Sequence, residues 1–190
     1  KLINNKHIPE ELIFSKINVK ENQIFWLFNP FAFKRDLDSI REIQNYNFKL
    51  GWDGVLTIRI EEKMPFMLWV DDDKNKYIDQ NGNILQLKIN DPPENFIRLF
   101  GEDANQKIAE LSDALKNNIF ILKDVDKILY KKNIGWQIKL IDNNCIFLPI
   151  KKLDKLIKMF ENISNSDLYD RFSFFDFRII GRVYMSNKEC

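Results

Sequence analysis

The chain has 190 residues, of which 45% are hydrophobic and 30% are charged. Its 29 Lys and Arg residues nearly balance its 28 Asp and Glu residues, which leaves a formal net charge of +1. This composition is typical of globular proteins and excludes an intrinsically disordered chain. Nucleic-acid-binding domains usually carry a basic stripe and a pI above about 9, so a pI of 7.9 argues against a nucleic-acid partner. The length is sufficient for two small domains.

The residue types on which most hydrolytic and metal chemistry depends are scarce. His7 is the only histidine, so neither a His-based triad nor a zinc site with several imidazoles can be assembled. Residues 71–75 resemble the start of a calcium loop, but Lys76 stands where that loop needs Gly and Gly82 where it needs Glu. The acids at residues 61–62 are neighbours on a predicted strand and point to opposite faces. We therefore expect no catalytic site, no metal site and no cofactor.

Two amphipathic helices are predicted in residues 7–14 and 30–43. Pro9 and the two acids that follow it suit the first turn of a helix, and so does the Pro that follows Asn29. The second helix carries apolar residues at intervals of three and four, which predicts one packed face. These residues are Phe33, Leu37, Ile40 and Ile43.

A β-hairpin is predicted next, because apolar and polar residues alternate in residues 46–50 and again in residues 55–61. The turn-forming residues 52–54 separate the two runs. Two helices and a hairpin within about 60 residues make a compact α+β unit, which we assign to residues 1–68. We expect the first strand of this unit to lie before Lys1 and to be missing.

Residues 69–190 are dominated by short strand signals, including an Asn-Gly pair at residues 81–82 between two apolar runs. Two amphipathic helices interrupt the strands. The predicted strands span residues 76–79, 84–87, 119–130, 135–141, 145–148 and 172–185, and the predicted helices span residues 103–115 and 153–160. The fold class predicted for the whole chain is therefore α+β.

Two groups of residues admit more than one interpretation. Cys145 and Cys190 are the only cysteines. We expect both to be free, with Cys145 in the core, whereas a disulfide would require an oxidising compartment. Lysines also cluster on a predicted helix and on a predicted strand. Each cluster is either a solvated face or a surface for an anionic membrane or an acidic partner. These lysines are Lys151, Lys152, Lys155 and Lys158 on the helix and Lys127, Lys131 and Lys132 on the strand.

Several stretches together resemble the bacterial cell-division protein family FtsQ, called DivIB in Gram-positive bacteria. They are residues 52–69 (WDGVLTIRIEEKMPFMLW), 77–82 (YIDQNG), 135–140 (GWQIKL), 148–149 (LP), 175–178 (FDFR) and 182–183 (RV). Each stretch alone is weakly specific. Their order and spacing agree with the family pattern from about Pro9 to Met185, which is nearly the whole chain.

The resemblance implies a single-pass protein of the inner membrane, with this region on the periplasmic side. It implies a POTRA domain at residues 1–68, truncated at its N-terminus, and a β domain at residues 69–190 that ends in an edge strand. The family has no enzymatic activity. It is a divisome scaffold that binds FtsB and FtsL and helps to control septal peptidoglycan synthesis, and other divisome proteins are expected to bind the POTRA domain.

In the family, FtsB adds a strand to the last strand of the β domain, which here is residues 172–185. Arg178 then corresponds to a charge partner for an FtsB acid, and the packing contacts include Phe174, Phe177 and Ile179. The full set of expected partner-binding residues is Lys132, Phe174, Phe177, Arg178, Ile179, Arg182, Val183 and Tyr184. The alternative is another POTRA-containing binding module, of outer-membrane protein assembly or secretion, in which an edge strand captures clients.

Overall fold

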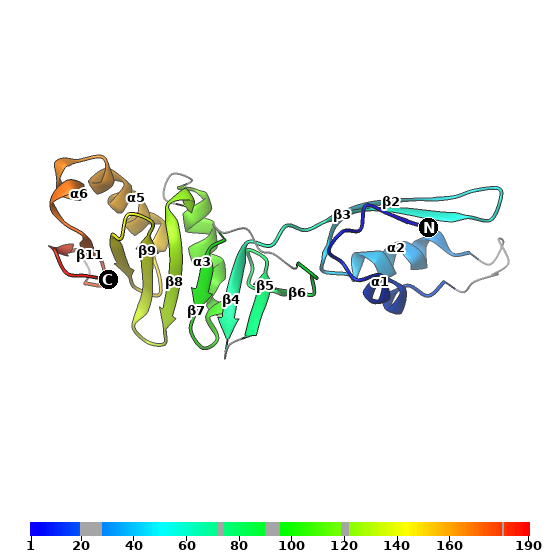
Figure 1. Ribbon diagram of the computed structural model, residues 1–190, viewed down its shortest axis with the longest axis horizontal. Helices are drawn as coiled ribbons and strands as arrows, with labels where there is room; N and C mark the ends of the chain where they lie inside the picture. Colours follow the sequence, from blue (N-terminus) through cyan, green and yellow to red (C-terminus); the bar gives the residue numbers. More distant parts are fainter. Residues whose placement is uncertain (20–27, 72–73, 90–95, 119–121, 180) are drawn as a thin grey trace. The chain divides into compact units, whose positions relative to one another are not determined.

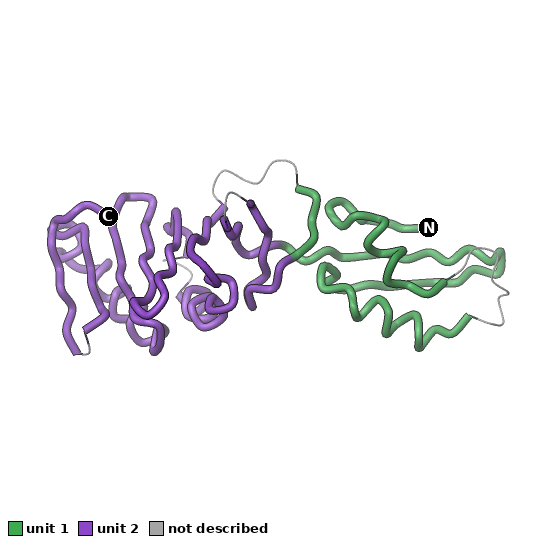
Figure 2. The backbone as a smooth tube through the Cα atoms, turned by 90° about the horizontal axis from the view of Figure 1, so that it is seen from below, with its two compact units in different colours: residues 1–64, 85–92 green, residues 65–84, 93–190 purple. Residues whose placement is uncertain are grey.

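The computed structural model describes residues 1–19, 28–71, 74–89, 96–118, 122–179 and 181–190. The chain divides into two compact units (Figure 2). The first unit contains Lys1–Met64 and Leu85–Pro92, and the second contains Pro65–Ile84 and Pro93–Cys190. The chain therefore passes from one unit to the other three times. Helices and β-sheets occur in both units, which confirms the α+β fold class.

The first unit is a three-stranded sheet with two helices (Figure 1). Its elements are β1 (Leu2–Ile3), α1 (Glu10–Lys16), α2 (Pro30–Asp38), β2 (Ile43–Leu50) and β3 (Leu56–Glu62). The strand order is β1-β3-β2, with β1 parallel and β2 antiparallel to β3. The unit thus has a first strand after all, although β1 contains only two residues.

Local chemistry explains where α2 begins and what it buries. The side chain of Asn29 accepts hydrogen bonds from the backbone N–H groups of Phe31 and Ala32, both at 3.1 Å, and Pro30 occupies the first helical position. Phe33 and Leu37 of α2 join the core of the unit, as the apolar spacing predicts. The helix is shorter than predicted, because it ends at Asp38, so Ile40 lies after it and Ile43 begins β2. The buried residues of this core are Ile8, Ile13, Phe33, Leu37, Ile40, Ile43, Ile58 and Ile60.

The segment that follows β6 (Ile84–Leu85) returns to the first unit. The backbone N–H of Gln86 donates to Oε1 of the buried Glu42 at 2.9 Å, and the N–H of Lys88 donates to the carbonyl of His7 at 2.8 Å. Leu87 packs against the apolar core of the unit. The strand predicted for residues 84–87 therefore ends at Leu85, because the next residues bond to the first unit instead of continuing a hairpin.

The carboxylate of Glu62 fixes the chain between β1 and α1. It accepts hydrogen bonds from the backbone N–H groups of Lys6, His7 and Ile8 at 2.6 to 2.9 Å, and Nδ1 of His7 lies 2.9 Å from Oε2. Burial by itself would raise the pKa of Glu62. The hydrogen bonds from Ile8, His7 and Lys6 outweigh it, so this pKa is lowered from its ordinary value of 4.5.

We expect Glu62→Gln to lower the free energy of unfolding by about 2 kcal/mol at pH 7, the size of one or two hydrogen bonds to a charged group. Because the pKa of Glu62 is lowered in the folded state, its stabilisation is complete above pH 4.5 and is lost as the pH falls through the lowered pKa. Urea titrations at pH 7 and pH 3 measure this difference. The exposed neighbour gives the control, since Glu61→Gln should change stability little at either pH.

The second unit is built on a nine-stranded sheet with the order β12-β11-β10-β9-β8-β7-β4-β5-β6. Helices α3 and α5 pack on the same face of this sheet (Figure 1). The strands not yet given are β4 (Met67–Asp71), β5 (Lys74–Ile78), β7 (Arg98–Phe100), β8 (Val125–Lys131), β9 (Gly135–Leu140), β10 (Cys145–Leu148), β11 (Phe174–Asp176) and β12 (Tyr184–Ser186). The helices whose bounds the described residues give are α3 (Ala104–Lys116), α5 (Leu153–Ser164) and α6 (Asp167–Arg171).

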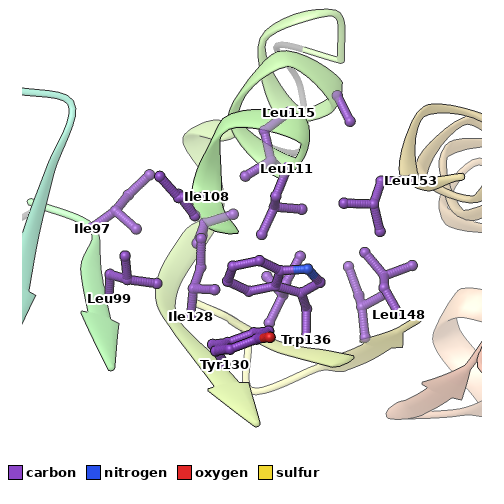
Figure 3. Packing of buried hydrophobic residues seen from close by; sticks show 14 of the residues in the cluster. Ile97, Leu99, Ile108, Leu111, Leu115, Ile128, Tyr130, Trp136, Leu148 and Leu153 are labelled. Atoms are coloured by element: carbon purple, nitrogen blue, oxygen red, sulfur yellow. The ribbon is translucent and has the colours of Figure 1, made fainter. Parts of the chain in front are cut away.

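The core of the second unit lies between the sheet and the two long helices. Trp136 of β9 is 2% exposed, and its ring lies 4.7 Å from that of Tyr130 on β8. Leu111 of α3 and Leu153 of α5 point toward the same region from the helix layer (Figure 3). Alternate residues of β8 and β9 point to the core, so Trp136 and its buried neighbours mark the covered face of the sheet.

The C-terminal stretch differs from the sequence-based prediction. Residues 172–185, predicted as one strand, form two short strands that pair with each other. β11 pairs in parallel with β10, whereas β12 pairs antiparallel to β11 and ends the sheet. The predicted strand at 119–130 also starts later, at Val125, and its residues 119–121 lie outside the described part of the chain.

Cys145 and Cys190 form a disulfide, so the expectation that both are free was wrong. Their Cα atoms lie 5.6 Å apart, within the range of ordinary disulfides. Cys145 is fully buried in β10, and Ser173 Oγ donates to the carbonyl of Lys188 at 3.2 Å. The residues after β12 are thus tied back to the sheet.

We expect Cys190→Ser to lower the free energy of unfolding by about 2 to 4 kcal/mol, because the bridge closes a loop across 45 residues. This variant leaves the buried Cys145 in place and so creates no cavity. Thermal unfolding with and without a thiol reductant measures the effect. The reductant should destabilise the unchanged chain and leave the variant as it is, and equal sensitivity of the two proteins would contradict the bridge.

Candidate partner-binding site at the last strands

The candidate site lies at one end of the nine-stranded sheet, where β12 is the terminal strand. Its register pairs Tyr184 with Asp176 and Ser186 with Phe174 on β11. In the described part of the chain, no further strand pairs with the outer side of β12. An edge strand of this kind exposes backbone N–H and C=O groups that can bond to an added strand.

Arg178 is held by its own chain at the end of β11. Its Nη2 and Nε donate to the two carboxylate oxygens of Asp176 at 2.6 and 2.9 Å, and its backbone N–H donates to the same carboxylate at 2.9 Å. The guanidinium also lies 5.0 Å from the centre of the Phe147 ring. This bidentate pair and the ring fix the direction of the guanidinium.

The pair shifts the pKa of both partners. Burial would raise the pKa of Asp176, but the hydrogen bonds and the charge of Arg178 lower it. The hydrogen bond from Arg178 to Asp176 raises the pKa of the guanidinium in turn. Both groups are therefore charged at neutral pH. The guanidinium of Arg178 can bind an acid of a partner only while it also binds Asp176.

The other expected contact residues fall into two groups. Ile179 is 61% exposed and Tyr184 is 55% exposed, and Arg182 and Lys132 are also exposed. Phe177, in contrast, is 2% exposed and packs in the core against Phe160 of α5. Its side chain is closed to a partner. The side chain of Phe177 points to the opposite side of the chain from that of Asp176, and α5 covers the side to which Phe177 points.

Two half-buried residues lie between these groups. The ring of Phe174 is 4.6 Å from that of Phe147 and 6.5 Å from that of Tyr184, so Phe174 supports the exposed Tyr184. Val183 packs against the apolar core of the unit. Phe147 is a contact residue of this surface that was not expected from the sequence. It alternates with the buried Ile146 and Leu148, so its position already indicated that it faces away from the core.

Gly135 allows the backbones of β9 and β10 to approach each other beside the turn that carries Lys132. Its φ is +125°, and a Cβ atom at this position would lie 2.0 Å from the carbonyl oxygen of Leu148. A side chain here would push β10 away from β9. This close approach explains why Gly directly precedes the buried Trp136.

We expect Gly135→Ala to lower the melting temperature by several degrees or to prevent folding, because both the φ angle and the clash oppose it. Gly181→Ala is the matched control, since Gly181 has a φ of +74° but open space around its Cβ position. Calorimetric melting of both variants separates the clash from the strain. Equal losses in the two variants would contradict a role for the close approach.

Comparison with protein families adds to this geometry. The family model for the C-terminal region of the cell division protein FtsQ/DivIB matches residues 67–178, more than half of the chain. The chain belongs to the FtsQ/DivIB family. The match begins at the first strand of the second unit and ends at Arg178. β12, the strand at the free edge, lies beyond it.

A solved structure is also similar to this FtsQ/DivIB chain. It is the major extracytoplasmic domain of the trans isomer of the cell division protein DivIB from Geobacillus stearothermophilus, with 18% sequence identity and a TM-score of 0.43. The alignment covers 58% of this chain and 97% of that one. A search of curated proteins finds no match. Among the described residues, no helix is long and apolar enough to cross a membrane, and no group of three or more acidic, His or Cys residues could hold a metal ion.

Proposed function

We propose that this chain is the periplasmic part of a non-catalytic divisome scaffold, anchored in the inner membrane by a single span, that binds FtsB and FtsL and helps to control septal peptidoglycan synthesis. Membership of the FtsQ/DivIB family gives the cell-division role. The observation that supports the binding role is the free outer side of β12 at the end of the sheet. In this proposal the first unit is the POTRA domain, and it is available to other divisome proteins.

The proposed mode of binding is strand addition. An extended FtsB segment pairs its backbone with β12, and backbone hydrogen bonds supply affinity that does not depend on sequence. Ile179 and Tyr184 supply selectivity, because both are large, apolar in part and exposed. Arg178 offers its guanidinium to an FtsB acid next to the bound Asp176. Phe177 takes no part, because it is buried.

The choice of test variant follows from these contacts. A change at Arg178 would release Asp176 and uncover the Phe147 ring, so its effect on binding would include damage to the site. The side chain of Ile179 has no such partner in the described contacts and is 61% exposed, and only its backbone carbonyl accepts a hydrogen bond, from the N–H of Arg182. Ile141 has the same exposed fraction and directly follows β9, which β10 and β11 separate from β12 in the sheet, so it is a matched control.

We expect Ile179→Lys to weaken binding of the periplasmic segment of FtsB about tenfold or more, because a buried apolar contact of this size is worth at least about 1.4 kcal/mol. Ile141→Lys should leave the affinity unchanged. Isothermal titration calorimetry of the unchanged chain and both variants measures this, with circular dichroism as the check on folding.

Two results would contradict the proposal. Equal weakening by the two isoleucine variants would mean that Ile179 does not contact the segment. No binding at high micromolar concentration, with FtsL present as well as FtsB, would favour the alternative of a binding module for outer-membrane protein assembly or secretion.

A further inference from the structure

A second surface of the β domain carries a row of basic residues that takes no part in strand addition at β12. Helices α3 and α5 cover one face of the sheet, and the opposite face of β7, β8 and β9 is called here the open face. Three cations lie in one line across it. The sheet register places Arg98 of β7 directly opposite Lys127 of β8, and Lys127 directly opposite Lys139 of β9. We call these three residues the basic ladder.

The basic ladder brings three like charges together on neighbouring strands. Among the described residues, none of its three side chains forms an ion pair within 4.0 Å. Asp176 lies opposite Phe147 in the row next to the ladder, and its carboxylate is bound to Arg178. Like charges directly opposite each other on neighbouring strands repel. The sheet therefore carries a repulsion that an external acid would relieve.

An apolar row runs beside the basic ladder. Phe100 pairs with Leu129, and Leu129 pairs with Gln137, two residues further along the same strands. All three side chains are half-buried, and none of them belongs to the core cluster that contains the buried residues of α3 and α5. A hollow of about 320 Å³ lies over this part of the open face. It is lined by Phe100, Lys127, Leu129, Gln137, Lys139 and Cys190.

The two rows together match one kind of ligand. Neighbouring strands lie about 4.8 Å apart, and one turn of an α-helix advances about 5.4 Å. A helix that crosses the strands can therefore place one acid per turn against Arg98, Lys127 and Lys139. Apolar residues on the neighbouring stripe of such a helix would meet Phe100 and Leu129. A polyanion without apolar groups would make no apolar contact with Phe100 and Leu129.

We propose that the open face docks an acidic amphipathic helix of a partner protein, with its acids on the basic ladder and its apolar stripe on Phe100 and Leu129. The attraction is local, because the chain as a whole has a net charge of only +1. Cys190 and its bridge to Cys145 hold the end of the chain at the border of the hollow. The surface is separate from the outer side of β12, and the proposal does not depend on the binding of FtsB there.

The test uses the whole 190-residue chain and a synthetic helical peptide of about 20 residues with Glu once per turn and Leu on the adjoining stripe. A second peptide has the same composition in scrambled order, and poly-glutamate tests charge alone. The protein variant is Lys127→Glu with Lys139→Glu. Its matched control is Lys151→Glu with Lys155→Glu, which changes the net charge equally at exposed positions before and on α5.

Fluorescence anisotropy should show saturable binding of the helical peptide, weaker at high salt and at least tenfold weaker in the Lys127→Glu, Lys139→Glu variant than in the control variant. Amide chemical shifts should change on β7 to β9. Equal losses in the two variants, or equal binding of poly-glutamate or the scrambled peptide, would overturn the proposal in favour of general charge attraction. Absence of binding up to millimolar peptide would overturn it outright.

Discussion

The register between β8 and β9 decides most of what this protein presents to its surroundings. It places Trp136 beside Tyr130 in the core, and by alternation it places Gln137 and Lys139 on the opposite face. A slip of one residue would bury the lysine and expose the tryptophan. On the other side of β9, Gly135 allows the close approach of β10, because only a residue without a side chain can come so close to Leu148.

The same sheet separates the structural residues of the C-terminal stretch from the residues that a partner could reach. Phe175 and Phe177 point into the core that α5 covers, whereas Phe174 and Tyr184 belong to the other face. The disulfide and the pair between Arg178 and Asp176 hold this end in place. The edge strand is therefore short but well supported, as a site for strand addition requires.

Much of the fold is predictable from the sequence, because the alternation in β3, β8, β9 and β10 and the apolar spacing of α2, α3 and α5 are strong local signals. The parts that were missed depend on distant contacts. β7 has three residues and β1 has two, too few for a pattern, and each exists because a longer strand lies beside it. The disulfide depends on a chain reversal after β11 that no local pattern reveals. For the site, the exposure of Ile179 and the burial of Phe177 could not be predicted from the sequence, because they depend on where α5 packs.

The central claim is that β12 receives a strand from FtsB. Hydrogen–deuterium exchange of the chain with and without the periplasmic segment of FtsB tests it most directly, because an added strand protects the outward N–H groups of the edge and little else. The account predicts slower exchange at Tyr184–Ser186 on binding, with β6 at the opposite end of the sheet unchanged. Protection that appears on β2 or β6 while Tyr184–Ser186 exchange as before would contradict it.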